Sequence, residues 1–182
     1  MSISIRQRIY LSFLLLVLLF VINAIVTVVT LSGNNKLSSH LSKVIEPSLQ
    51  TMEDFKKMMI ESKMYTTNWV FFRSREEDKS ILKDIHDTRY TALKTDMKER
   101  MIMWENRNMA GDMDSIFSGF EQLMVIEKGI MGSLKTFEDY DDPVAKLSAE
   151  LQVEEEILPR TTALVASLDR LINMKRAIRE KE

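Results

Sequence analysis

The sequence of 182 residues predicts an all-α protein, and three features of the chain support this. It contains only 5 Gly and 3 Pro, fewer turn-forming residues than a protein of many short strands requires. Its long segments are rich in Leu, Met, Lys and Glu, which favour helices. Apolar residues recur at intervals of three and four, as on one face of a helix. We therefore expect an up-down-up-down antiparallel four-helix bundle whose first helix continues from an N-terminal transmembrane helix.

The first predicted element is an apolar segment, residues 9–31, which contains no charged residue. About 20 apolar residues in a helix span the roughly 30 Å core of a bilayer, whereas a cleaved signal peptide has an apolar region of about 7–15 residues. We therefore predict an uncleaved transmembrane anchor in contact with membrane lipid. Arg6 and Arg8 precede the anchor, so the positive-inside rule predicts that residues 1–8 are cytoplasmic. Residues 32–182 should then form a helical domain outside the inner membrane, in the periplasm or extracellular space.

The first bundle helix is expected to continue outward from this anchor. Small or apolar residues recur along it in steps of three and four: Leu41, Ile45, Ser48, Met52, Phe55, Met59, Ser62, Thr66 and Trp69. Pro47 should bend this helix, because its ring removes a backbone donor and crowds the preceding turn. Ser74 and Glu77 have the spacing of a capping box and predict the start of the second helix.

The other three helices are predicted in the same way. The second carries a stripe of Leu82, Ile85, His86, Arg89, Leu93, Met97, Met101 and Trp104 and ends near Asn106. The third carries Met113, Ile116, Phe120, Leu123, Glu127, Ile130, Leu134 and Phe137. The fourth begins near Pro143 and carries Val144, Leu147, Leu151, Glu154, Leu158, Thr161, Val165, Leu168 and Ile172, with a kink expected at Pro159.

Polar residues on these stripes predict a polar layer in the core. Matching heights along antiparallel helices at about 1.5 Å per residue places Ser62, Arg89, Glu127 and Glu154 at one level. Buried charges must be paired, and a guanidinium can bridge two carboxylates, so the four residues form a consistent set. Such a layer either specifies helix register or provides an element with two arrangements for signalling, and we favour register.

Composition and motifs exclude several functions. The net charge is -2 and the chain has no basic cluster before its C-terminal segment, so we expect no nucleic-acid partner. Cys is absent, and His40 and His86 lack the motifs of metal sites, so both are interpreted as surface or rim residues. Several of the 13 Met residues, including Met52, Met59, Met97, Met101 and Met113, lie on the core stripes and are interpreted as core packing, and we expect no metal and no cofactor. The chain has no G-x-S-x-G, P-loop or dinucleotide-binding motif, so we do not expect an enzyme.

Four short segments resemble a known family. They are "MSISIRQRI" at the start, "EPSLQTM" after the anchor, "ESKMYTTNWVFF" before the first turn, and "ILPR" in the last helix. Together with the helix pattern they resemble the four-helix-bundle sensor domain of methyl-accepting chemotaxis receptors and of related sensor histidine kinases, over essentially the whole chain. The resemblance implies a periplasmic, homodimeric input module followed by a second membrane helix, a HAMP linker and a signalling domain.

We therefore predict a ligand-sensing input domain that transmits helix shifts across the membrane. The last helix is expected to return to the bilayer, so the chain is interpreted as the front part of a longer receptor, with chemotaxis and kinase outputs both open. Lys63, Asn68, Arg73 and Arg160 are candidate ligand contacts, although each is also an ordinary surface residue, and the ligand is unidentified. The alternative is a non-sensing, membrane-anchored helical module that dimerises or binds a protein partner.

Overall fold

The computed structural model describes the backbone of residues 5–72 and 74–181 and, within these ranges, the side chains of residues 10–11, 13–30, 43–72 and 74–180. The described backbone forms helices and turns and contains no strand. The prediction of an all-α protein is therefore confirmed. The chain divides into two compact units, Met1–Lys43 and Val44–Glu182, and each is considered by itself.

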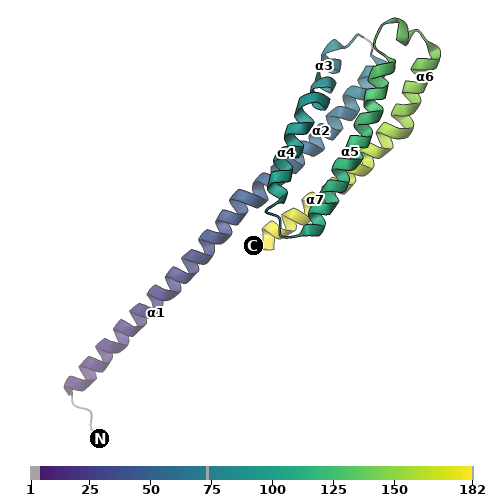
Figure 1. The fold of residues 1–182 in the computed structure, drawn as a ribbon. Helices are drawn as coiled ribbons and strands as arrows, with labels where there is room; N and C mark the ends of the chain where they lie inside the picture. Colours follow the sequence, from purple (N-terminus) through teal and green to yellow (C-terminus); the bar gives the residue numbers. More distant parts are fainter. Residues whose placement is uncertain (1–4, 73, 182) are drawn as a thin grey trace. The chain divides into compact units, whose positions relative to one another are not determined.

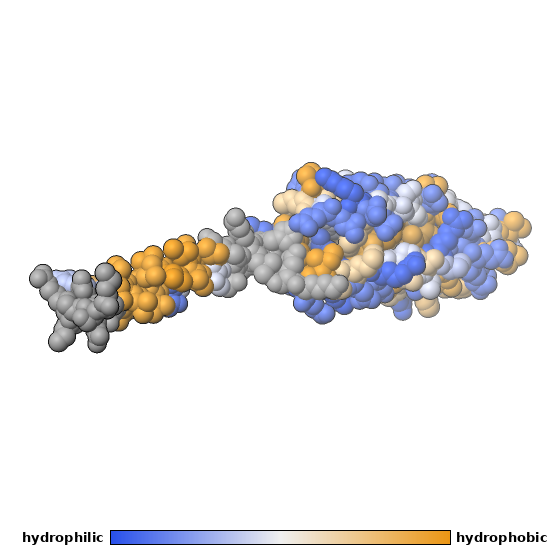
Figure 2. Space-filling model, turned by 90° about the horizontal axis from the view of Figure 1, so that it is seen from below, coloured by the Kyte–Doolittle hydropathy of each residue, from blue (hydrophilic) through white to orange (hydrophobic). Residues whose placement is uncertain are grey.

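The first unit consists of helix α1 (Ile5–His40). Within the described residues, one helical segment is long and apolar enough to cross a membrane: Phe13–Thr30, of which no residue is buried. Figure 2 shows its apolar side chains as a continuous orange surface, whereas hydrophilic residues predominate on the visible face of the second unit. The side chains of Arg6 and Arg8, on which the predicted orientation depends, lie outside the described residues.

The second unit begins with the last two residues of a π-helical turn, η1 (Leu41–Ile45), followed by α2 (Glu46–Phe71) (Figure 1). The later elements are α3 (Glu76–Asp84), π-turn η2 (Ile85–Arg89), α4 (Tyr90–Met101), α5 (Arg107–Ser133), the 3-10 turn η3 (Glu138–Tyr140), α6 (Pro143–Gln152), π-turn η4 (Val153–Ile157) and α7 (Leu158–Lys181). More helices are therefore present than the sequence predicted. The extra ones arise because π-turns divide the first, second and fourth predicted helices, the first being the one expected to continue from the anchor.

Helix α2 makes the widest set of contacts in the second unit. It packs against α3, α4, α5 and α7, and α5 in turn packs against α6 and α7 (Figure 1). Ion pairs join α2 and α7 at three levels: Lys56 to Asp169 at 2.6 Å, Glu53 to Arg176 at 2.6 Å, and Glu46 to Arg179 at 3.1 Å. The C-terminal end of α7 therefore lies beside the N-terminal end of α2.

Apolar packing forms the core of the second unit, largely where the periodicity predicted it. Every described residue of the predicted α2 stripe is buried, as are the predicted residues of α5 from Met113 to Ile130. The rings of Phe55, Tyr90, Phe117 and Phe120 form a cluster at its centre, with centroids 5.0 to 6.3 Å apart. Burial of such large apolar groups is the main favourable term in folding, so this cluster anchors three of the helices together.

A buried tryptophan covered by a lysine lies at each end of this core. Trp104 donates its indole N–H to Ser48 Oγ at 3.0 Å, and Lys175 Nζ lies 4.4 Å from its ring centroid. At the other end, Trp69 donates to the carbonyl of Leu134 at 2.9 Å, and Lys79 Nζ lies 5.4 Å from its ring centroid. Each lysine can cover apolar surface with its stem and place its cation over an aromatic face.

Of the two start signals predicted from the sequence, Pro143 is confirmed and Ser74 is not, and Asn106, near which the second helix was predicted to end, marks the start of α5. Asn106 caps α5, because its side chain accepts hydrogen bonds from the N–H groups of Asn108 and Met109. Asp142 caps α6 in the same way, with Pro143 in the first turn as predicted. The capping box predicted from Ser74 is wrong, since α3 begins at Glu76 after Arg75 and has no side-chain cap.

In the first half of the fourth predicted helix, the buried face differs from the predicted one. Four apolar residues predicted in the core are exposed: Val144, Leu147, Leu151 and Leu158. Ala149, Val153 and Ile157 are buried instead, whereas Thr161, Leu168 and Ile172 are buried as predicted. A π-turn bonds each N–H to the carbonyl five residues back, so η4 contains one residue more than an α-helical turn. Counting back from Thr161 with α-helical spacing therefore gives positions one residue too late at Leu158 and two residues too late at Leu151.

Candidate functional site

A polar layer lies in the core, and it is made of Ser62 on α2, His86 on η2 and Glu127 on α5. The side chains of His86 and Glu127 are each 1% exposed, and His86 Nε2 lies 2.7 Å from Glu127 Oε2. Ser62 Oγ donates to the same carboxylate, at 2.9 Å from Oε1 and 2.8 Å from Oε2. Three helical segments are therefore joined at one level by hydrogen bonds inside an apolar core.

Two polar atoms of this region have no hydrogen-bond partner among the described residues. They are Nδ1 of His86 and Oγ1 of Thr66, which is fully buried one turn from Ser62 on α2. A buried polar atom without a partner costs roughly 1–3 kcal/mol. The layer therefore costs some stability, and its role in specifying helix register stays a prediction.

The predicted polar layer is partly correct. Ser62 and Glu127 lie in the core and hydrogen bond to each other, but Arg89 and Glu154 do not join them. The Arg89 side chain is 37% exposed and pairs with Glu61 at 2.8 Å, and Glu154 is exposed. His86, interpreted from the sequence as a surface or rim residue, takes the place beside Glu127.

Both errors have one physical cause. Arg89 lies in the π-turn Ile85–Arg89, and Glu154 lies in the π-turn Val153–Ile157. Each turn contains one residue more than an α-helical turn, so the inward-facing position moves by one residue along the chain. Tyr90 is buried where Arg89 was predicted, and Val153 is buried where Glu154 was predicted.

The structure does not bring the candidate ligand residues together. Asn68 donates to Asp78 at 2.8 Å, and Arg160 pairs with Glu156 one turn earlier on its own helix, at 2.5 Å. No hydrogen bond or ion pair joins Lys63, Asn68 and Arg160 among the described side chains. Arg73 lies outside the described residues.

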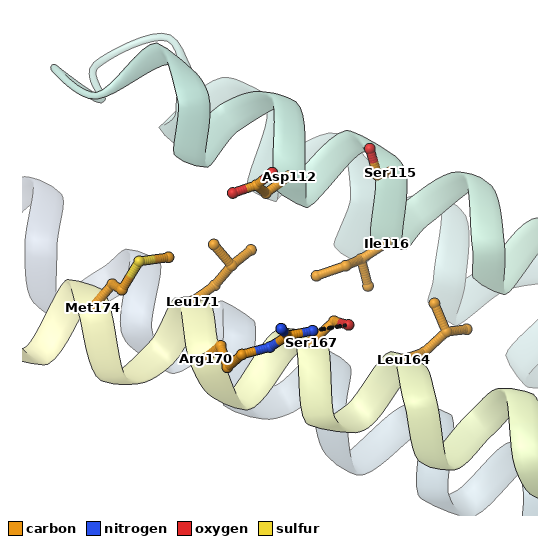
Figure 3. Close-up of a pocket in the computed structure, with 8 residues that line it drawn as sticks. All are labelled: Asp112, Ser115, Ile116, Leu164, Ser167, Arg170, Leu171 and Met174. Carbon is orange, nitrogen blue, oxygen red and sulfur yellow. Dashed lines mark hydrogen bonds between the residues drawn. The ribbon is translucent and has the colours of Figure 1, made fainter.

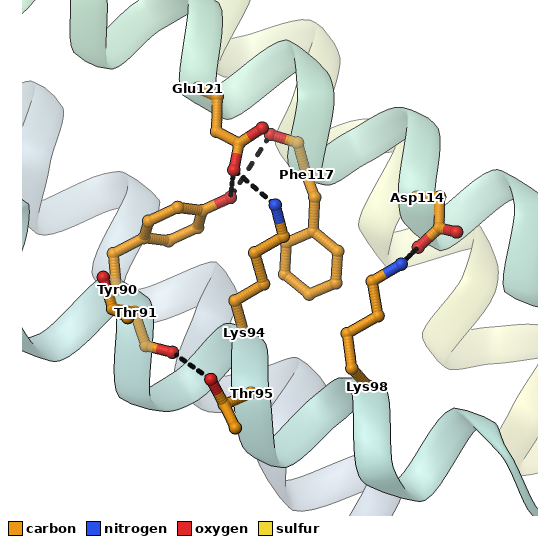
Figure 4. Close-up of polar contacts among 8 residues, drawn as sticks. All are labelled: Tyr90, Thr91, Lys94, Thr95, Lys98, Asp114, Phe117 and Glu121. Carbon is orange, nitrogen blue, oxygen red and sulfur yellow. Dashed lines mark hydrogen bonds and ion pairs between the residues drawn. The ribbon is translucent and has the colours of Figure 1, made fainter.

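Charged side chains close the seam between α4 and α5 (Figure 4). Lys98 pairs with Asp114 at 2.5 Å, while Lys94 and the Tyr90 hydroxyl both donate to Glu121. Burial raises the pKa of Tyr90, and its hydrogen bond to Glu121 raises it further. The hydrogen bond from Lys94 lowers the pKa of Glu121, so this carboxylate stays ionised at neutral pH.

The seam between α5 and α7 contains a cavity of about 460 Å³ (Figure 3). Its apolar lining comes from Ile116 on α5 and from Leu164, Leu171 and Met174 on α7, and Ile116 and Leu171 are buried. Its polar lining residues are Asp112, Ser115, Ser167 and Arg170. In Figure 3 Asp112 and Arg170 lie on opposite walls, with Leu171 pointing between them, and Ser115 points away from the cavity. The volume lies in the range of small-molecule sites, about 300–1,000 Å³.

Sequence reasoning did not select Asp112 or Arg170. Neither residue belongs to a motif, and both lie on polar faces of long helices, where a charged residue is ordinary. The available signal was their position beside core residues, Asp112 next to Met113 and Arg170 next to Leu171. Such residues lie at the border of the buried stripe, where a side chain reaches the seam between helices.

Comparisons with known proteins do not assign the chain to a family. No protein-family model matches, and neither a curated protein nor a solved structure matches. Across the described residues, no group of three or more His, Cys, Asp or Glu side chains is placed to hold a metal ion. The function must therefore be argued from the helix that can cross a membrane, the packing of α2 with α7, the polar layer and the cavity.

Proposed function

We propose that this chain is the extracytoplasmic ligand-sensing input domain of a bacterial transmembrane receptor. Under this proposal α1 anchors the chain in the inner membrane with residues 1–8 in the cytoplasm, and the second unit is an up-down-up-down four-helix bundle. The first and third helices of this bundle are α2 and α5. The second is α3 together with α4, and the fourth is α6 together with α7. The observation that carries the proposal is the pairing of α2 with α7. The backbone is helical from Ile5 through Phe71, and the last described helix runs back beside the start of α2.

This pairing suits the transmission of a signal by movement of one helix against another. Ligand binding that favours one position of α7 against α2 shifts the population of two arrangements, provided that the ligand has different affinity for them. The ion pairs at three levels between these helices can re-form after a shift of about 1–2 Å, whereas tightly packed apolar cores resist continuous deformation. The π-turns are the places where backbone hydrogen bonding departs from a regular α-helix, and one of them carries His86 of the polar layer, which makes them suitable points for rearrangement.

The test is a disulfide that fixes α7 against α2. The natural chain contains no Cys, so engineered pairs have no competing thiols. Glu53→Cys with Arg176→Cys replaces an ion pair of 2.6 Å between the two helices. The chain is joined after residue 182 to the second membrane helix and kinase half of a sensor histidine kinase whose autophosphorylation is measured. Oxidation of this pair should hold kinase activity at one level, and reduction should release it.

The matched control fixes a different seam. Lys98→Cys with Asp114→Cys replaces an ion pair of 2.5 Å between α4 and α5, neither of which leads toward the membrane in the proposal. Its oxidation should therefore change kinase activity by less than about twofold, which corresponds to about 0.4 kcal/mol. If both pairs form disulfides and neither changes kinase activity, the sensor proposal is wrong.

The proposed orientation is tested separately. A periplasm-dependent phosphatase fused after residue 182 should be active, because Arg6 and Arg8 favour a cytoplasmic N-terminus. The same fusion in a chain with Arg6→Glu and Arg8→Glu should lose part of this activity. Activity of a cytoplasm-dependent reporter at the same position would contradict the orientation.

One observation favours the second candidate, a membrane-anchored module that dimerises without sensing. Val144, Leu147 and Leu151 form an exposed apolar stripe on α6 with the spacing of a coiled-coil seam. A second copy presents the same stripe, so a symmetric pair of α6 helices would cover it. Leu147→Glu should then convert a dimer into a monomer in light-scattering measurements of the detergent-solubilised chain, whereas Val125→Glu, at another exposed apolar residue, should not. This candidate replaces the first if the stripe mediates dimerisation and the α2–α7 disulfide leaves kinase activity unchanged.

A further inference from the structure

We propose that the cavity between α5 and α7 binds a small amphiphilic zwitterion, a molecule with an apolar body, one cationic group and one carboxylate. The inference rests on the proposed sensing function in one respect only: under that function, this molecule is the signal. Binding itself does not depend on that function.

The charges at this seam differ from those at the seams already described. Opposite charges close the other seams in pairs: Lys98 with Asp114 between α4 and α5, and Lys56 with Asp169 between α2 and α7. At the α5–α7 seam, no ion pair joins Asp112 to Arg170 among the described side chains. Arg170 Nη2 instead donates to Ser167 Oγ on its own helix at 3.0 Å (Figure 3). An acid and a guanidinium on opposite walls are therefore both available to a molecule between them.

The lining defines the rest of the ligand. Ile116 and Leu171 are 4% and 2% exposed and form an apolar surface between the two charges, and Leu164 and Met174 extend it along α7. An aliphatic or aromatic group covers this surface without leaving a buried polar atom unpaired. A carboxylate accepts two hydrogen bonds from the planar guanidinium of Arg170, and an ammonium group donates to Asp112. A molecule with one charge satisfies only one wall, so both charges are required for full affinity.

Ligand binding at this position would act on α7, the helix whose movement carries the signal in the proposed function. Asp112 lies on α5 and Arg170 on α7, so a molecule that bridges them favours the spacing of α5 and α7 that fits it. Gly119 lies next to this seam, and a Cβ at that position would lie only 2.6 Å from Leu164 Cδ2. The Leu164 side chain, which lines the cavity, therefore packs directly against α5 at this glycine, so the cavity and the α5–α7 contact share this residue.

The experiment measures binding directly on the full chain in phospholipid nanodiscs. Met174 lines the cavity, so its methyl group, labelled with carbon-13, reports the occupant in an NMR spectrum assigned with Met174→Leu. Met64, an exposed residue of α2, supplies the control signal. The probes are L-leucine, L-leucyl-L-leucine and 6-aminohexanoate, which separate their charges by different distances. At least one probe should shift the Met174 signal with a Kd of about 1 mM or tighter and leave Met64 unchanged.

Blocked probes and variants test the role of the charges. The methyl ester of the best probe and its N-acetyl derivative each lack one charge and should bind at least about tenfold more weakly. Asp112→Asn and Arg170→Gln should each weaken binding by about the same factor. The matched controls are Asp114→Asn and Arg176→Gln, on the same helices, whose charges pair with Lys98 and Glu53 at other seams. These controls should keep the affinity within about twofold.

Several results would overturn the proposal. It is wrong if no probe shifts Met174 up to about 10 mM, if the blocked probes bind as well as the zwitterion, or if the control variants weaken binding as much as the cavity variants. It is also wrong if the Met174 signal changes with protein concentration in the absence of a probe, because a second copy then fills the cavity. None of these results bears on the kinase response to the α2–α7 disulfide, so failure of this inference and failure of the sensing function are separable.

Discussion

The strongest prediction concerns the free energy of unfolding carried by the pair of His86 and Glu127. The two side chains are each 1% exposed, and Nε2 of His86 lies 2.7 Å from Oε2 of Glu127. We replace each by an apolar residue of similar size, with His86→Leu and Glu127→Met as single variants and as a double variant. Similar side-chain volumes keep the cost of new cavities small compared with the cost of an unpaired polar group.

The burial and hydrogen bonds of the pair determine the expected magnitudes. His86→Leu leaves the buried carboxylate with only the hydroxyl of Ser62, and removing one member of a buried pair costs about 3–5 kcal/mol. Glu127→Met leaves the imidazole without a partner on Nε2, while its Nδ1 already has none among the described residues. We expect a cost of about 2–4 kcal/mol from unpaired buried polar groups at both ring nitrogens. The double variant removes both polar groups, so it should cost far less than the sum and even approach neutrality.

Urea unfolding of residues 44–182, the part of the chain that forms the second compact unit, measures these energies by circular dichroism. The double-mutant cycle isolates the coupling between the two positions from effects that each substitution has alone. A parallel cycle with Lys98→Met and Asp114→Leu examines an ion pair whose side chains are 46% and 49% exposed. That control pair should show a coupling below about 1 kcal/mol, as exposed ion pairs do.

A specific result refutes this reasoning. If the costs of His86→Leu and Glu127→Met add within about 0.5 kcal/mol, the two groups are not coupled and the polar layer does not exist in solution. If the double variant has instead lost its helical circular dichroism, the polar layer is needed for folding itself. In that case its proposed role, specifying register at some cost in stability, is wrong.

Three further predictions use the same unfolding assay. Arg89→Ala should cost less than about 1 kcal/mol, because its ion pair with Glu61 is partly exposed; a cost of 3 kcal/mol or more would place Arg89 in the core. The hydrogen bond from Arg100 lowers the pKa of Asp96 below 3.8, so this carboxylate stabilises the fold above that pH and stabilises it less as the pH falls. Asp96→Asn should reduce the loss of stability at acid pH by up to about 1 kcal/mol after allowance for solvent screening, and an unchanged pH profile of stability would contradict this prediction. Gly129→Ala should stabilise α5 by about 0.5–1 kcal/mol, because a Cβ there meets nothing within 4 Å; destabilisation would show an unseen contact.

The buried faces of α2 and α5 were predictable because each of these elements is one regular, uninterrupted α-helix. An α-helix returns to the same face after three or four residues, so the stripe from Ser48 to Trp69 identifies the buried side of α2 without any knowledge of its neighbours. Ser62 and Glu127 lie on these regular stripes and were selected correctly as polar core residues. Arg89 and Glu154 lie in π-turns, where the same count fails.

Part of this irregularity is visible in the sequence. Pro47 and Pro159 each follow a π-turn by two residues, because proline lacks the N–H that would continue the α-helical pattern and crowds the preceding carbonyl. A proline inside a helical stripe is therefore a signal to restart the count on its N-terminal side. The π-turn that carries His86 has no proline within it, so nothing in its own residues gave a comparable warning.

The sequence alone determined that this protein is helical, that one segment is apolar enough to cross a membrane, and which faces of α2 and α5 are buried. These properties follow from local composition and from periodicity, which a single helix expresses without its partners. Only the tertiary structure decided that His86 and not Arg89 meets Glu127, and that Asp112 and Arg170 line one cavity, with no ion pair between them among the described side chains. The reason is that such pairings depend on the rotation and height of one helix against another, and one extra residue in a π-turn changes both without altering the hydrophobic pattern on either side.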